Sequence, residues 1–282
     1  MGFRIITDSA SDMPQETAEK MGVTVMPIHT RFGEQEYLDG VTLKPREFFE
    51  KLVETDEIPK TSQITPFEFE EEFDKWISAG ESVLCITMSA GVSGTYHSAC
   101  AAAEDFGDKV IVIDSRQFCI SLYVLVEYAC RLRDAGKTLQ ETAAAVEEAK
   151  KRVHVISVFA TLEYLKLGGR ISAAAAMAGN ILSIKPVITI RKGVVEVIGK
   201  ARGSKKANNM LVEFIEQVGG VDYNMPYCLG FTGFSEEVLL KYVDDNAARY
   251  KEAIKNITIV PVGATVGTYA GPGAVALAFF NK

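Results

Sequence analysis

The stretch SVLCITMSAGVSGTYHSA (82–99) predicts a buried strand, a loop of small hydroxyl residues and the start of a helix. Its first seven residues, SVLCITM (82–88), form a short and continuously apolar run. Such runs are typical of strands that are buried on both faces of a parallel sheet. The order strand, polar loop and helix therefore indicates an α/β fold with polar loops at the carboxyl ends of its strands.

The same pattern occurs on either side of this stretch. FRIITDS (3–9) and KVIVIDS (109–115) are short apolar runs that end in Asp-Ser, and VTVMPIHTRF (23–32) predicts one further strand. Helices are predicted over 65–80 and 121–136, each closed by a glycine. The first half thus predicts a mostly parallel sheet with helices on both faces, whose strand-end loops gather on one rim.

The pattern changes in the second half of the chain. VITIRKGVVEVIGKAR (187–202) predicts a hairpin that turns at 191–193, and a helix is predicted over 204–217. Strands are expected again in ITIVPVG (257–263) and AVALAFF (274–280). We therefore predict two domains, an α/β domain over 1–155 and an α+β domain with antiparallel strands over 156–282.

Composition and charge exclude several classes of protein. The chain is 48% apolar, yet no apolar run reaches the roughly 18 residues of a membrane span. A net charge of −7 argues against broad nucleic-acid binding. A strand begins almost at once, so we expect no secretory leader, and the five cysteines form no CxxC pair. These features favour a cytoplasmic protein with free thiols.

The loop from Ser89 to Thr95 leaves three interpretations open. Ser93 could be a nucleophile, but the G-x-S-x-G pattern lacks its last glycine, and the nearest histidine, His97, lies four residues further on. Anion binding fits better, because the amides of Gly94 and Thr95 lie at a predicted helix N-terminus and Ser93 and Thr95 add hydroxyl donors. An ordinary helix cap is the third interpretation.

Cofactor and metal sites find little support in the sequence. Three histidines without close ligand pairs make a zinc site improbable, and no GxxxxGK[ST] motif occurs. GTYAGPG (267–273) is rich in glycine but does not open a dinucleotide-binding unit. We therefore expect no metal, no cofactor and no nucleotide hydrolysis by this chain.

LKLGGRIS (165–172) carries a candidate anion ligand. Gly168 is expected to end a helix in a left-handed cap, and Gly169 to allow close backbone approach. Arg170 then projects from a tight corner, where a guanidinium could bind a carboxylate or phosphate, although it could equally cap helix carbonyls.

Two further segments have both a functional and a purely structural interpretation. KARGSKKA (200–207) places Arg202, Lys205 and Lys206 together, either as a solvated helix start or as a docking patch for an acidic partner. SAAAAMAGNIL (172–182) predicts a helix of small residues. It either packs closely against a neighbour or forms the wall of an apolar tunnel with Met177, Ile181 and Leu182.

Eight motifs in order resemble the DegV family of bacterial fatty-acid-binding proteins. They cover nearly the whole chain and are ITDSASD (6–12), YLDG (37–40), KTSQITP (60–66), SAGVSGTYHSA (89–99), VIDS (112–115), LEYLKLGGRIS (162–172), IKPVITIRKGVVEVIGKARGSKKA (184–207) and GPGAVALAF (271–279). Each motif is weak alone, but their common order is specific. The resemblance implies a long-chain fatty acid buried between two domains.

The resemblance also implies roles for particular residues. The carboxylate would be held by Thr61 and Ser93, with Ser62 and Gly94 beside them, and Arg170 would be its charge partner. Some members serve as the acyl-carrying subunit of a fatty acid kinase that feeds phospholipid synthesis. In such a protein the position of Arg202 is linked to docking of the ATP-binding kinase subunit, and lipid exchange would require transient membrane contact.

One position departs from the family pattern. The family usually has a histidine two residues before GPG, where this chain has Tyr269. A tyrosine can donate a hydrogen bond to a carboxylate, but with an ordinary pKa near ~10 it does not readily carry a proton at neutral pH. Fatty-acid binding should survive this change, whereas formation of an acyl phosphate is in more doubt. A stand-alone acyl hydrolase using Ser93 and a storage or sensing protein without a kinase remain the alternatives.

Overall fold

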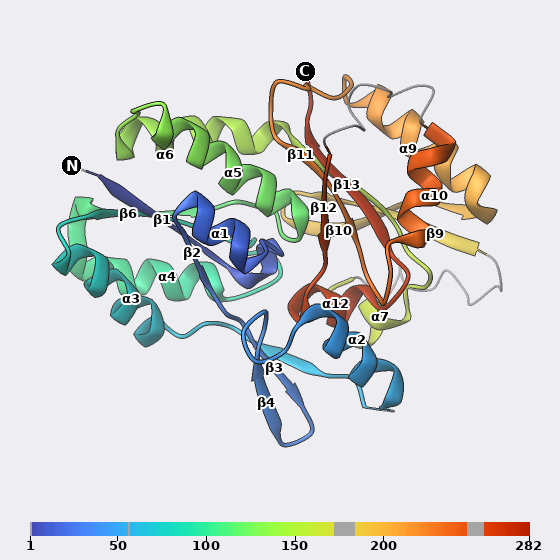
Figure 1. The fold of residues 1–282 in the computed structure, drawn as a ribbon, viewed down its shortest axis with the longest axis horizontal. Helices are drawn as coiled ribbons and strands as arrows, with labels where there is room; N and C mark the ends of the chain where they lie inside the picture. Colours follow the sequence, from blue (N-terminus) through green and yellow to red (C-terminus); the bar gives the residue numbers. More distant parts are fainter. Residues whose placement is uncertain (1, 56, 172–183, 247–256) are drawn as a thin grey trace.

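The computed structural model describes residues 2–55, 57–171, 184–246 and 257–282. Three sheets organise the chain (Figure 1). The first is parallel throughout and has the order β2-β1-β6-β7. Its strands are β1 (Phe3–Asp8), β2 (Val23–Met26), β6 (Ser82–Thr87) and β7 (Val110–Asp114).

Helices cover both faces of this parallel sheet, as predicted. They are α1 (Gln15–Met21), α3 (Pro66–Ser78), α4 (Thr95–Ala103), α5 (Ile120–Asp134) and α6 (Leu139–Ala149). The pair α3 and α4 packs on one face, while α5 and α6 pack on the other (Figure 1). Short 3-10 turns at Ser9–Ser11, Glu104–Lys109 and Lys150–Arg152 complete the connections.

A small antiparallel sheet interrupts the first half, and the sequence analysis did not predict it. It has the order β4-β3-β5, with β3 (His29–Phe32), β4 (Gln35–Leu38) and β5 (Lys60–Ser62), and α2 (Pro45–Glu54) follows β4. The single strand predicted over 23–32 is therefore wrong. The chain leaves the parallel sheet at Pro27, whose ring nitrogen has no hydrogen to donate to a ladder.

The third sheet is mixed, with five antiparallel-paired strands and one parallel edge strand. Its order is β10-β9-β8-β13-β11-β12, and only β11 and β12 run parallel. The strands are β8 (Val153–Val158), β9 (Ile184–Arg191), β10 (Val194–Arg202), β11 (Tyr227–Phe231), β12 (Thr258–Pro261) and β13 (Val275–Phe280). The helices that accompany it are α7 (Glu163–Leu167), α9 (Gly203–Gln217), α10 (Glu237–Asn246) and α12 (Ala264–Ala270).

Helix α5 lies between the two large sheets. It contacts β1 on one side and β8, β11 and β13 on the other. Nine of its fifteen residues are buried, so it carries apolar side chains around most of its circumference. One apolar cluster consequently spans both halves of the chain, and a second one lies within the later half. The predicted boundary at residue 155 falls inside β8, and we propose that the division lies just before this strand.

The helices of the described ranges do not meet the requirements of a membrane span. Within these ranges, none combines the length and the apolar character that crossing a bilayer requires.

Candidate functional site

The polar loops at the carboxyl ends of β1, β6 and β7 meet on one rim, as predicted. The Asp8 carboxylate accepts hydrogen bonds from the backbone N–H groups of Met88 (2.7 Å) and Ala10 (3.1 Å). The Asp114 carboxylate accepts one from the N–H of Ala90 (3.2 Å). These backbone contacts fix the start of the loop that carries Ser93.

A cavity of about 320 Å³ opens beside this rim. Pockets of ~300–1,000 Å³ are typical of small-molecule sites. Its lining residues come from both halves of the chain: Ile28, Thr61, Ser62, Gln63, Met88, Val92, Ser93, Gly94, Phe118, Leu165, Arg170, Val195, Thr265, Val266 and Tyr269. Six of the seven predicted head-group ligands therefore line the same space.

Two hydroxyl groups from distant parts of the chain meet in this cavity. Thr61 Oγ1 and Tyr269 Oη share a hydrogen bond of 2.7 Å, although 208 residues separate them in sequence. Thr61 lies on β5 and pairs with Thr30 of β3, whereas Tyr269 lies on α12. Ser93 and Gly94 line the cavity from the loop before α4. The cavity thus has one end rich in hydroxyl groups, which can donate to an anion.

Thr95, the remaining predicted head-group ligand, is not among the residues that line the cavity. It begins α4 and is fully buried, so its side chain lies behind Ser93. Thr95 Oγ1 and Ser93 Oγ share a hydrogen bond of 2.9 Å, and the Thr95 amide donates to Ser93 Oγ over 3.2 Å. Thr95 therefore orients the Ser93 hydroxyl, and its amide is already occupied.

Arg170 lies at the exposed edge of the cavity. Its guanidinium carbon is 5.0 Å from the centre of the Tyr269 ring, and its Nη1 donates to the carbonyl oxygen of Gly168 over 2.7 Å. The guanidinium thus lies over the aromatic ring, and among the described residues its other N–H groups have no hydrogen-bond partner.

The two glycines before Arg170 exchange the roles that the sequence predicted for them. Gly168 has φ −75°, an ordinary helical value, whereas Gly169 has φ +69° and makes the left-handed turn. A Cβ on Gly168 would lie 2.3 Å from the Tyr269 ring, while a Cβ on Gly169 would meet open space. Gly168 is therefore the residue that allows Tyr269 to approach.

Helix α12, which supplies Tyr269, is anchored by buried carboxylates. Asp39 accepts hydrogen bonds from the amides of Ala264 (2.8 Å) and Thr265 (3.1 Å), and Asp12 accepts one from Gly263 (2.8 Å). Burial raises the pKa of Asp12 to about 8 and also raises the pKa of Asp39, although backbone hydrogen bonds oppose the effect. Burial likewise raises the pKa of Asp8 to about 7.

A second, smaller cavity continues from the first on its apolar side. It measures about 50 Å³ and shares Phe118 and Val266 with the larger cavity. Its other lining residues are Cys119, Val155, Ser157, Phe159, Ile188, Ile190, Gly230, Phe231, Thr232, Val262, Ala270, Ala274, Val275 and Ala276. It therefore lies between the six-stranded sheet, helix α12 and the two residues that precede α5. The predicted tunnel residues Met177, Ile181 and Leu182 lie outside the described residues.

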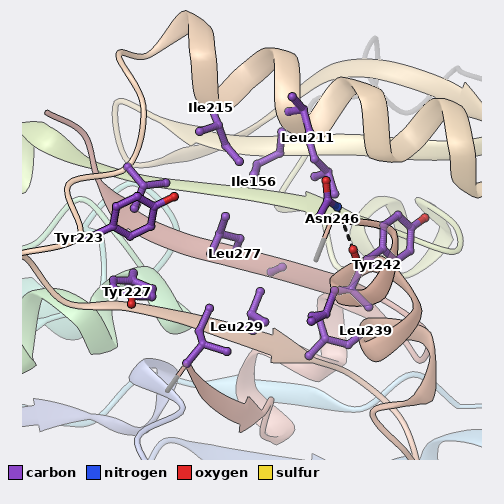
Figure 2. Close-up of a pocket in the computed structure, with 16 residues that line it drawn as sticks. Ile156, Leu211, Ile215, Tyr223, Tyr227, Leu229, Leu239, Tyr242, Asn246 and Leu277 are labelled. Carbon is purple, nitrogen blue, oxygen red and sulfur yellow. Dashed lines mark hydrogen bonds between the residues drawn. The ribbon is translucent and has the colours of Figure 1, made fainter. Parts of the chain in front are cut away.

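A third cavity of about 100 Å³ lies under α9 and α10, away from the hydroxyl cluster. Figure 2 shows it between these helices and the outer face of the sheet, with Leu211, Leu229 and Leu277 directed toward it. It shares no lining residue with the cavity that contains Thr61. This space belongs to the apolar core of the second half.

The geometry around Ser93 does not resemble a hydrolase triad. The hydrogen bonds of its hydroxyl run to Thr95, while His97 is exposed and meets the Tyr96 ring edge-on, with 5.3 Å between ring centres. No group of three or more His, Cys, Asp or Glu side chains is placed to hold a metal ion in the part of the chain that the structure describes.

The predicted docking residues lie on a different surface element. Arg202 ends β10, and Lys205 and Lys206 lie in the first turn of α9. All three are exposed. Cavity residues that the sequence analysis missed include Gln63, Phe118 and Thr265, and Gln63 could have been considered because it directly follows Thr61 and Ser62.

Comparisons with known proteins agree with this architecture. The family model described as "Uncharacterised protein, DegV family" matches residues 2–282. A DegV domain-containing protein of Caldanaerobacter subterraneus is 34% identical over 99% of this chain and 98% of its own length. A solved structure described as fatty acid binding of a DegV family protein from Thermus thermophilus is 29% identical, with a TM-score of 0.89 and full coverage of both chains.

A second solved structure is similar over the same length. The stearic acid-binding protein from Eubacterium ventriosum is 26% identical, has a TM-score of 0.86, and covers 99% of this chain and 98% of its own. The resemblance inferred from eight ordered motifs is thereby confirmed, together with the predicted combination of a parallel first sheet and a largely antiparallel later one. The chain belongs to the DegV family.

Proposed function

We propose that this protein binds one long-chain fatty acid, whose carboxylate lies at the hydroxyl groups of Thr61, Ser93 and Tyr269. One observation carries the proposal: a cavity of about 320 Å³ is lined by hydroxyl groups and by apolar side chains, and it shares Phe118 and Val266 with a second, apolar cavity. The relatives from Thermus thermophilus and Eubacterium ventriosum, which are described as binding a fatty acid, support it.

The head group needs donors because an unpaired buried charge is costly. Thr61 and Tyr269 share a hydrogen bond, so one of these two hydroxyls keeps its hydrogen for the carboxylate. Ser93 can donate another while Thr95 donates to Ser93 Oγ, and Ser62 and Gly94 line the same cavity. Arg170 adds a positive charge at the exposed edge. In this arrangement hydrogen bonds hold the carboxylate, while the guanidinium offsets its charge without being buried.

The acyl tail accounts for most of the affinity. Each buried methylene contributes roughly 0.8 kcal/mol, so a chain of ~16 carbons contributes on the order of 10 kcal/mol before the losses of freedom on binding. We propose that the tail passes Phe118 and Val266 into the smaller cavity. Contacts with Met177, Ile181 and Leu182 remain part of this proposal.

Mass spectrometry of the purified protein tests the proposal directly. We expect a stoichiometric fatty acid in the native spectrum, which is lost after solvent extraction and regained on adding palmitic acid. The double variant Thr61→Val, Ser93→Ala should retain less fatty acid while its circular dichroism stays unchanged. A matched double variant at exposed positions, Thr258→Val, Ser78→Ala, should retain as much as the wild type.

The outcomes separate the alternatives. An empty protein that takes up no palmitic acid would contradict the proposal, and full retention by a folded Thr61→Val, Ser93→Ala variant would contradict the head-group site. Covalent labelling of Ser93 by a serine-directed phosphonate would instead favour a stand-alone hydrolase. We expect no labelling, because the Ser93 hydroxyl is bonded to Thr95 and no histidine activates it.

A second proposal concerns the fate of the bound fatty acid. The exposed positive charges of Arg202, Lys205 and Lys206 favour a protein that docks an ATP-binding kinase subunit and presents its fatty acid to it. Tyr269, which replaces the histidine of the family pattern, favours a storage or sensing protein instead. In either role the protein would act in the cytoplasm and meet membranes transiently to exchange its lipid.

Turnover in a reconstituted mixture distinguishes these roles. The protein, a kinase subunit from a related bacterium and ATP are mixed, and acyl phosphate is measured for the wild type and for Tyr269→His. Turnover by the wild type, lost on reversing the charge of Arg202, would support the carrier role. Turnover by Tyr269→His alone would support storage or sensing.

A further inference from the structure

Gln63 connects two elements that the sequence analysis treated separately. It follows β5 directly, and its Nε2 donates a hydrogen bond to Ser98 Oγ over 2.9 Å. Ser98 is buried one turn into α4, and its own amide donates to the carbonyl oxygen of Gly94 over 3.0 Å. The carboxamide of Gln63 therefore ties the strand that carries Thr61 to the first turn of α4.

The same side chain explains why residue 94 is a glycine. A Cβ at Gly94 would lie 1.9 Å from Gln63 Oε1 and 2.7 Å from its Cδ, closer than atoms can approach. The backbone does not demand glycine, since φ −77° and ψ −3° are open to any residue. The Gln63 carboxamide thus occupies the space that a side chain at position 94 would need.

We propose that Gln63 is a positioning residue, which locks β5 against the N-terminus of α4 so that the hydroxyls of Thr61 and Ser93 face the same point. This inference rests on the proposed fatty-acid function and adds to it. Gln63 lines the cavity next to Ser62, but its two amide atoms are directed to Ser98 and to the space beside Gly94. Its role is therefore to fix the spacing between the two loops.

Loss of the Gln63 carboxamide should affect recognition of the carboxylate and not burial of the acyl chain. Without the Gln63 carboxamide, β5 and α4 would keep their places in the fold, but the two hydroxyls would no longer converge on one carboxylate. Binding of a fatty acid should weaken, because its charge needs that convergence. Binding of a fatty alcohol of equal length should change little, since its uncharged head needs only one partner.

Affinities for palmitic acid and hexadecanol measured on four proteins test the inference. They are the wild type, Gln63→Ala, Gly94→Ala and the double variant. We expect each single change to lower the affinity for palmitic acid about tenfold, which corresponds to the loss of about one hydrogen bond to the carboxylate. The affinity for hexadecanol should change little. The double variant should bind palmitic acid no more weakly than the single variant of lower affinity. Once Gln63 is an alanine, an alanine at position 94 has no carboxamide to displace. Gln15→Ala, at an exposed position on α1, is the matched control.

The outcomes distinguish this inference from the proposed function. Additive losses, or equal weakening of palmitic acid and hexadecanol, would overturn the positioning role. A wild type that binds neither ligand would overturn the proposed function instead. If Gly94→Ala does not fold, Ser98→Ala replaces it, since this change removes the hydrogen-bond acceptor without adding volume. It should reproduce the selective loss, and an unchanged ratio of affinities would overturn the inference.

Discussion

The Ser89 hydroxyl donates a hydrogen bond to the carbonyl oxygen of Gly193 over 2.8 Å, which joins the loop after β6 to the turn between β9 and β10. Gly193 has φ +81°, and a Cβ there would lie 2.3 Å from Ser89 Oγ. Both the conformation and the space thus require glycine. Val195, two residues further along β10, lines the cavity, so this contact holds the hairpin beside the cavity.

Replacing Ser89 with alanine should therefore loosen the hairpin. We expect the free energy of unfolding to fall by about 1 kcal/mol, the net worth of one hydrogen bond. Fatty-acid release should become faster, because Val195 would cover the cavity less firmly. Urea denaturation and stopped-flow release of a fluorescent fatty acid measure the two effects. Ser78→Ala, an exposed serine on α3, is the control, and equal release rates would contradict the prediction.

The neighbouring glycines 168 and 169 offer a matched pair of variants. Gly168→Ala places a methyl group against the Tyr269 ring, so Tyr269 should move away from Thr61 and fatty-acid affinity should fall severalfold. Gly169→Ala meets open space but strains a left-handed residue, which should cost about 1 kcal/mol of stability and leave affinity unchanged. Titration calorimetry and thermal unfolding separate the effects. The reverse pattern would refute the assignment of the two glycines.

His29 should make stability depend on pH. Its two ring nitrogens contact the carboxylates of Glu36 and Glu68, the latter at 2.8 Å. Burial alone would lower the pKa of His29, but the hydrogen bonds that its ring donates to the carboxylates of Glu68 and Glu36 outweigh burial and raise this pKa. The stabilisation is thus present below the unfolded pKa of ~6.5 and is lost as pH rises through the folded value.

The variant His29→Gln isolates this contribution. We expect the difference in unfolding free energy between wild type and variant to shrink from pH 6 to pH 8 and to stay below about 1 kcal/mol, since Glu36 is largely exposed. The exposed His97→Gln is the control. A difference that grows with pH would mean that His29 is neutral in the folded protein.

Asp12 should also make stability fall as pH rises, but through burial of a neutral acid and not through an ion pair. Its folded pKa is raised to about 8, whereas an unfolded aspartate titrates near ~3.9. The folded state therefore binds more protons between these values, and the free energy of unfolding should fall as pH rises through this window. Asp12→Asn should flatten that slope and keep the hydrogen bond from Gly263. The exposed Asp74→Asn should leave the slope as it is in the wild type.

Filling the smaller cavity should change the preferred chain length. Ala274 is buried and lines this space, so Ala274→Leu would occupy much of its roughly 50 Å³. We expect the extracted fatty acids to shift toward shorter chains, with an overpacking cost of ~1–3 kcal/mol in stability. Extraction followed by mass spectrometry gives the distribution. An unchanged distribution in a folded variant would show that the tail lies elsewhere.

The strands that carry the site could be predicted because their apolar runs are continuous. β1, β6 and β7 are buried on both faces, so each left a clear signal, and the rim of their loops followed from sheet geometry. Helix α12 left no such signal. It has only seven residues, among them valine, glycine and two threonines, and it depends on Asp39 and Asp12 for its N-terminus.

In the candidate site, too, residues with a local sequence pattern could be predicted, whereas residues that depend on distant partners could not. Ser93 was visible because a strand, a small polar loop and a helix adjoin in sequence. Gln63 adjoins Thr61 and Ser62, but its contacts with Gly94 and Ser98 could not be predicted, because these residues lie 31 and 35 positions away and no local pattern links them. Thr95 stays a prediction, since spacing alone does not tell which hydroxyl faces the cavity and which faces the core, and the structure buries its side chain.

The position of β13 has a consequence for synthesis on the ribosome. This strand lies between β8 and β11, both of which precede it in the chain. At ~5–20 residues per second, β8 would wait on the order of ten seconds for its neighbour. During that interval the six-stranded sheet has two separate open edges, and the apolar space that Ala274 and Val275 line has no wall. Nascent chains should therefore depend on chaperones, and a fatty acid can be enclosed only after β13 has been inserted.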